Sequence, residues 1–169
     1  FKNVLVIEKD DLNVVYSVAK ETDFATSLLD GPYANTSLAK MVKKIADDYR
    51  LDAFREPITY FTDFERYAPA YFAPAAFVGA PIFNNNNIFI GILVAQIKAK
   101  NLNQVLANNY QWNKTGLGLT GHSYIVGKDK IIKSDLREYI QNKDNFLDKV
   151  KDQVDKKSLN QLKNNTLSN

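Results

Sequence analysis

Residues 76–97 read AFVGAPIFNNNNIFIGILVAQI, two apolar segments separated by a run of four asparagines. Asparagine is favoured in tight turns, so this run predicts the loop of a β-hairpin rather than a low-complexity region. The second segment, Ile88–Ile97, is apolar almost throughout, which is typical of a central strand that is covered on both faces. Pro81 has no amide hydrogen, so we expect its strand to lie at an edge or to bend there.

An amphipathic helix is predicted upstream of this hairpin. It begins near Thr36 or Ser37, whose hydroxyl groups can accept hydrogen bonds from the first free amides of a helix. Apolar residues then recur at steps of three and four and line one face: Leu38, Met41, Val42, Ile45 and Tyr49. Lysines and aspartates occupy the other face, so we expect the apolar face to pack into the core.

Further strands are predicted on both sides of this helix. Residues 4–7 and 14–18 are apolar and flank a polar turn, which indicates a hairpin, and residues 58–64 are rich in β-branched and aromatic side chains. Short connections favour antiparallel neighbours. The order strand, strand, helix, strand, strand, strand therefore predicts an α+β fold with an antiparallel five-stranded sheet and flanking helices.

A second unit is expected after the last strand. Leu102, Val105 and Leu106 have helical spacing, and a glycine-rich segment then leads to a predicted hairpin of residues 123–126 and 130–133. Beyond Asp135 the chain is polar, with apolar residues spaced loosely as on helix faces. We therefore divide the chain into residues 1–108, the sheet module, and residues 109–169, a connector, hairpin and helical tail.

Composition narrows the classes of protein that fit. The chain has 169 residues, 45% of them apolar, and a net charge of +3 with both signs interspersed. That is enough to bury a core, and it lacks the basic stripe that a nucleic-acid partner would require. Cysteine is absent, which excludes thiolate metal sites. No apolar run approaches the roughly 20 residues that cross a bilayer, and we expect any membrane anchors to lie outside this chain, which starts at Phe1.

Three separated motifs carry a family resemblance. They are VYSVAKETDF at 15–24 followed by GPY at 31–33, YAPAYFAPAAF at 67–77, and TGLGLTGHSYIVGKDKIIKSD at 115–135. Together they resemble the Cache family, the PAS-like extracytoplasmic sensor domains of bacterial chemoreceptors, histidine kinases and nucleotide cyclases. The resemblance implies a PAS-like sensor module followed by the beginning of a second one, in the periplasmic part of a homodimeric inner-membrane receptor.

An aromatic-rich segment, residues 60–77, supplies candidates for a ligand site. Pockets combine apolar walls with a few placed polar groups, and tyrosine offers both, although core packing is the simpler role for any one ring. Our hypothesis is a cavity lined by aromatic side chains, with Lys20 or Asp63 fixing a polar group of the ligand. The candidate ligand-binding residues are Tyr16, Lys20, Tyr33, Asp63, Tyr71 and Phe77.

Two other motifs have weaker chemical interpretations. Residues 116–121 match the G-x-G-x-x-G spacing of dinucleotide-binding turns, but that mechanism needs a strand before the glycines and a helix after them, whereas a strand is predicted to follow here. His122 is the only histidine, so it cannot form a histidine metal cluster, and no nucleophile motif accompanies it. We expect no catalytic residue, metal or cofactor.

The sequence thus favours a small-molecule sensor without catalytic activity, in a bacterial transmembrane receptor such as a methyl-accepting chemotaxis protein. One alternative is a ligand-free PAS-like module that dimerises in a histidine kinase or cyclase. A small hydrolase is a third reading, and it would need a nucleophile held near His122.

Overall fold

A computed structural model describes residues 1–51, 56–127, 132–156 and 159–160. The chain divides into two compact units, Phe1–Lys98 (unit 1) and Ala99–Asn169 (unit 2). The boundary predicted from the sequence, between residues 108 and 109, comes later in the chain than this one, by about the length of one short helix.

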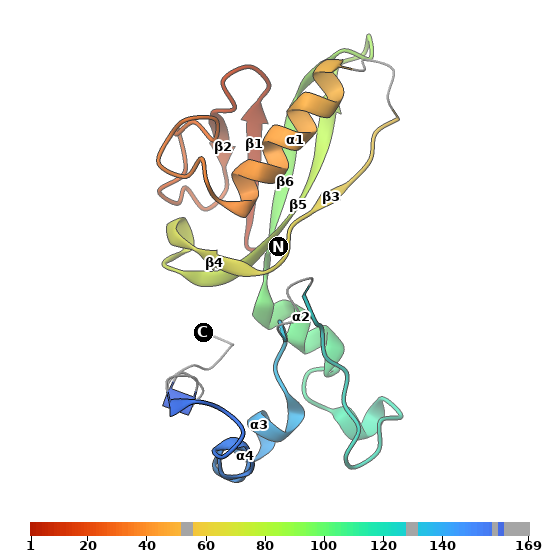
Figure 1. Cartoon of the computed structure of the whole chain (residues 1–169). Helices are drawn as coiled ribbons and strands as arrows, with labels where there is room; N and C mark the ends of the chain where they lie inside the picture. Colours follow the sequence, from red (N-terminus) through yellow and green to blue (C-terminus); the bar gives the residue numbers. More distant parts are fainter. Residues whose placement is uncertain (52–55, 128–131, 157–158, 161–169) are drawn as a thin grey trace. The chain divides into compact units, whose positions relative to one another are not determined.

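Unit 1 is an α+β domain with an open antiparallel sheet (Figure 1). The strand order is β2-β1-β6-β5-β3, and β4 also pairs with β5. The strands are β1 (Asn3–Glu8), β2 (Val14–Ser17), β3 (Tyr60–Phe61), β4 (Glu65–Tyr67), β5 (Ala73–Phe83) and β6 (Phe89–Lys98). The α+β prediction and the antiparallel pairing are confirmed.

The strand predicted at 58–64 is confirmed only in part, because β3 covers just Tyr60–Phe61 and the next strand, β4, begins after the segment at Glu65. Asp63 lies between β3 and β4: its carboxylate accepts a hydrogen bond from the Phe64 amide at 2.8 Å, and its carbonyl accepts one from the Thr62 hydroxyl at 3.0 Å. The described sheet therefore has six strands rather than five.

The central hairpin is confirmed as predicted from residues 76–97. In the asparagine loop, the Asn84 side-chain oxygen accepts hydrogen bonds from the amides of Asn86 and Ile88, both at 2.9 Å. β6 is central, since it pairs with β1 on one side and β5 on the other. The expectation that β6 is covered on both faces is wrong, because Ile90 and Leu93 are half exposed.

Helix α1 (Ser37–Leu51) covers one face of the sheet, here called the inner face (Figure 1). Its predicted apolar face is buried in full. At Gly79 of β5 the helix comes so close that an added Cβ would lie 2.8 Å from the Met41 Cε. The core of unit 1 therefore lies between α1 and the inner face of β1, β5 and β6.

The start of α1 gives a first testable prediction. The Thr36 hydroxyl accepts a hydrogen bond from the Ala39 amide at 3.2 Å, which satisfies one free amide of the first turn. Thr36→Ala is expected to cost about 1 kcal/mol of unfolding free energy, measured by urea denaturation followed by circular dichroism. Thr36→Ser keeps the hydroxyl and should lose much less, so equal losses in the two variants would contradict the capping role.

Unit 2 contains three short α-helices in its described part. They are α2 (Ala99–Leu106), α3 (Arg137–Gln141) and α4 (Lys143–Val150). The predicted hairpin is present as a single antiparallel bridge between Val126 and Ile132, and residues 128–131 lie outside the described residues. Within the described ranges, no helix is long and apolar enough to cross a membrane.

Arg137 organises the glycine-rich loop of unit 2. Its guanidinium is buried and donates to the carbonyl oxygens of Gly118 at 3.0 Å and Gly121 at 2.7 Å. It also donates to the Asn113 side chain at 3.0 Å and lies 5.2 Å from the centre of the Trp112 ring. The G-x-G-x-x-G segment thus wraps an arginine of its own chain.

Candidate functional site

The predicted binding residues that carry aromatic rings lie in different environments. Tyr71 is 91% exposed, and Tyr16 lies exposed on the outer face of β2, paired with Val6. Phe77 is only 1% exposed and packs edge to face on Tyr67, with ring centres 4.9 Å apart. Phe77 is therefore a core residue on the inner face, whereas Tyr16 and Tyr71 face solvent.

The other three predicted binding residues have local roles. Lys20 is exposed, at a left-handed position with φ of 49°. The Tyr33 hydroxyl shares a 2.7 Å hydrogen bond with the Thr22 hydroxyl, and the Asp63 carboxylate accepts one from the Phe64 amide between β3 and β4. The six side chains are thus not gathered around one cavity, since their placement depends on turns and strand faces that the sequence pattern did not reveal.

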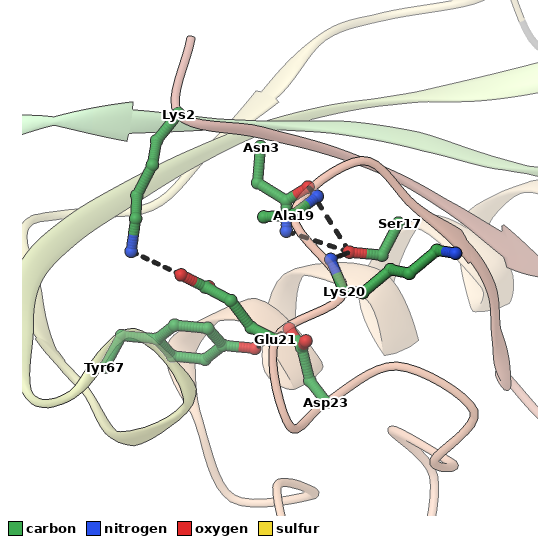
Figure 2. A network of polar contacts seen from close by, with 8 residues as sticks. All are labelled: Lys2, Asn3, Ser17, Ala19, Lys20, Glu21, Asp23 and Tyr67. Carbon is green, nitrogen blue, oxygen red and sulfur yellow. Dashed lines mark hydrogen bonds and ion pairs between the residues drawn. The ribbon is translucent and has the colours of Figure 1, made fainter.

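A different set of residues forms a buried polar cluster on the inner side of the sheet. They come from the residue before β1, from β1, β2, β4 and β6, and from the segment that follows β2, and Figure 2 shows all of them except Gln96. The buried polar cluster comprises Lys2, Asn3, Ser17, Glu21, Asp23, Tyr67 and Gln96.

Asn3 and Ser17 fix the segment that carries the two acids (Figure 2). The Asn3 side-chain amide donates to the Ser17 hydroxyl at 3.1 Å, and its oxygen accepts from the Ala19 amide at 2.9 Å. The Ser17 hydroxyl also accepts from the Lys20 amide at 2.9 Å. Because Asn3 and Ser17 are buried, these bonds hold residues 19–20 against β1 and direct the chain that follows toward the inner side of the sheet.

Tyr67 and Asp23 form a buried pair. The tyrosine hydroxyl donates to the Asp23 carboxylate at 2.6 Å, and both side chains are almost fully buried. Burial and, after it, the negative charge of Asp23 raise the pKa of Tyr67 far above its usual range. Tyr67 therefore remains a protonated donor, and Asp23 is bound through one of its two oxygens.

Four buried polar atoms of the cluster lack a hydrogen-bond partner among the described residues. They are the second carboxylate oxygens of Glu21 and Asp23, and both polar atoms of the Gln96 side chain. Gln96 lies opposite Asn3 on β1 and opposite Phe77 on β5, which places the three side chains in one row on the inner face. Buried polar atoms without partners are costly, so they indicate a place where water or a ligand binds.

Part of this cluster had a signal in the sequence. Gln96 interrupts an apolar strand, and Asn3 shares the alternation of the buried residues Leu5 and Ile7. Glu21 and Asp23 had none, because they lie in a polar segment whose path over the sheet is fixed by tertiary contacts.

Other parts of the chain offer less chemistry. His122 lies 5.5 Å from the Tyr124 ring, and the adjacent Ser123 hydroxyl donates to the Leu106 carbonyl at 3.0 Å rather than to the imidazole. Among the described residues, no group of three or more acidic or histidine side chains could hold a metal ion.

A surface groove of about 540 Å³ lies beside the asparagine loop, and the guanidinium of Arg50 at its rim donates to the Asp10 carbonyl at 2.7 Å. None of the six predicted binding residues lines this groove.

Taken with the fold, this geometry defines an α+β domain with a buried, partly unsatisfied polar cluster on the inner side of its sheet. In comparisons with known proteins, no protein-family model matches the chain, and no similar curated protein is found.

The Tyr67–Asp23 pair gives a second prediction. Tyr67→Phe removes the donor and leaves a buried carboxylate without it, which should cost about 1.5–3 kcal/mol of unfolding free energy in guanidinium denaturation. Tyr33→Phe is the matched control, because its hydroxyl bond to Thr22 is exposed and should be worth less than about 0.5 kcal/mol. Equal losses of unfolding free energy in the two variants would show that the buried hydrogen bond stabilises the fold no more than the exposed one.

Proposed function

We propose that this chain is the PAS-like, extracytoplasmic ligand-sensing domain of a bacterial transmembrane receptor, a chemoreceptor first among the candidates. The observation that carries the proposal is the buried polar cluster, whose carboxylates and glutamine keep free hydrogen-bonding atoms on the helix-covered side of the sheet. The strand order around α1 and the three Cache-like motifs support the same assignment. The domain would lie in the periplasm, as part of a homodimeric inner-membrane protein.

The cluster also offers a way to pass on a signal. Its polar groups come both from the sheet, at Asn3 and Gln96, and from the segment that carries Glu21 and Asp23. A ligand that bridges these two parts would favour the arrangement in which they are close. A ligand shifts such an equilibrium only by its difference in affinity for the two arrangements.

A thermal-shift screen of the purified chain tests the proposal. The compounds are organic acids, amino acids, amines, sugars and nucleobases. A ligand at about 100 times its dissociation constant should add roughly 2.7 kcal/mol and raise the melting temperature by several degrees. The shift should saturate and should weaken in Gln96→Leu, whereas Gln153→Leu, on an exposed position of unit 2, should respond like the unaltered chain. Absence of any selective shift would argue against a sensor.

A ligand-free dimerisation module is the second candidate, favoured by the apolar outer face of the sheet. Tyr16 and Leu93 both pair with Val6 and are about half exposed, and Phe61 is exposed on the same face, at the far edge. A face of this kind is typical of an interface, here with a second copy of the chain. Sedimentation equilibrium should then show a dimer that Leu93→Lys dissociates and that Val105→Lys, an exposed position of α2, leaves intact.

A further inference from the structure

The buried polar cluster contains two carboxylates but one cation. Lys2 forms an ion pair with Glu21. Asp23 is 0% exposed, and within the described part of the chain its carboxylate accepts a hydrogen bond only from the neutral hydroxyl of Tyr67. A buried carboxylate without a counter-charge is strongly unfavourable unless another group compensates it. Among the described residues, the cluster therefore has one more acidic side chain than cationic side chains.

The free oxygens in the cluster can only accept hydrogen bonds. Oδ1 of Asp23 and Oε2 of Glu21 are buried and have no donor among the described residues. An ionised carboxylate has no proton to offer, so a partner for these atoms has to bring its own donors. A ligand with a carboxylate or phosphate at this position would add repulsion instead.

Gln96 is an independent indication that a ligand binds beside the acids. It is 1% exposed, it lies on a different element, and neither its amide nitrogen nor its oxygen has a partner within the described ranges. Its neighbour in the inner-face row is Phe77, whose ring contacts Tyr67, the residue that binds Asp23. An amide supplies one donor and one acceptor group, which suits a hydroxyl or carbonyl of a small polar molecule.

Two aromatic rings also belong to the surroundings of the buried polar cluster. Tyr67 binds Asp23 and packs edge to face on Phe77, and the face of an aromatic ring attracts a cation. A carboxylate together with aromatic rings binds an ammonium group better than a neutral or anionic group, because both contributions depend on the positive charge.

We infer that the ligand of this site is a small molecule with a protonated amine, whose ammonium group binds Oδ1 of Asp23 and Oε2 of Glu21 while Gln96 binds a second polar group. The inference rests on the proposed sensor function and specifies its class of ligand. It differs from that function in requiring a positive charge on the ligand.

The test compares matched probes on the whole chain at neutral pH. Ethylamine, ethanolamine and putrescine are titrated by thermal shift and calorimetry beside ethanol, ethylene glycol and acetate, with sodium chloride at equal ionic strength. At least one amine should give a saturable shift that its matched alcohol, acetate and sodium do not give. Asp23→Asn keeps an acceptor for the Tyr67 hydroxyl and removes the charge, so it should weaken amine binding by about tenfold or more. Asp30→Asn, at an exposed position, should leave binding unchanged.

Each outcome tests the ammonium inference, the sensor function, or both. Saturable binding of an alcohol or of acetate without any amine would overturn the ammonium inference and keep the sensor. Equal shifts with sodium and with the amines would also overturn it, since an inorganic cation would then suffice. If none of these probes gives a shift and the broader screen above gives none either, both the ammonium inference and the sensor function are overturned. If Asp23→Asn does not fold, the comparison of amines with alcohols on the unaltered chain still decides.

Discussion

Phe77→Ala is expected to lower the unfolding free energy of unit 1 by about 3–5 kcal/mol. Phe77 is among the largest fully buried side chains, on the inner face of β5, and its ring packs edge to face on Tyr67. Its removal loses the transfer free energy of the ring and leaves a cavity in a closely packed core, which collapses only in part. Guanidinium denaturation followed by circular dichroism measures this loss.

Tyr71→Ala is the matched control for this prediction. Tyr71 is 91% exposed, so its removal should change the unfolding free energy by no more than about 0.5 kcal/mol. Both residues were candidates for a ligand site, and the two variants separate a core role from a surface role. A small effect of Phe77→Ala would contradict the core assignment and return Phe77 to the ligand candidates.

Arg137→Ala should be the largest disruption of unit 2, costing roughly 3 kcal/mol of its local stability. The buried guanidinium donates to two loop carbonyls and the Asn113 side chain, and hydrogen bonds from a charged group are the stronger kind. Hydrogen exchange should accelerate at residues 112–123, while β5 and β6 of unit 1 keep their protection.

Two further variants sharpen the test of Arg137. Lysine cannot reproduce the planar fork of arginine, so Arg137→Lys should recover only part of the protection. Lys114→Ala changes an exposed cation near the same loop and should have little effect. Unchanged exchange in Arg137→Ala would show that the glycine-rich loop is held by other contacts.

Local patterns predicted most of unit 1. Thr36 and the apolar spacing after it were enough to place α1, and the asparagine run was enough to place the β5–β6 hairpin, because capping, helical periodicity and turn chemistry act within a few residues. The strand predicted at 58–64 was right only at Tyr60–Phe61, since a run of β-branched and aromatic residues does not reveal where strand pairing stops.

The binding site was predicted much less well. Aromatic residues were taken as cavity walls, yet Phe77 and Tyr71 have the same type of side chain and opposite exposures. Which side of the sheet a strand residue faces follows from the register, and the position of Tyr71 follows from a left-handed turn with φ of 57°. Neither the side of the sheet nor the left-handed turn can be predicted from residue type alone.

The sequence by itself determined the α+β class, the helix, the central hairpin and the absence of thiol chemistry, because each depends on composition or on short-range spacing. Only the tertiary structure decided that Asp23, Tyr67 and Gln96 belong to one cluster, since these residues lie far apart in the chain. The contacts that unite them are a buried hydrogen bond, an edge-to-face ring contact and a cross-strand pair. Such contacts form only when the whole sheet assembles, so no local pattern can encode them.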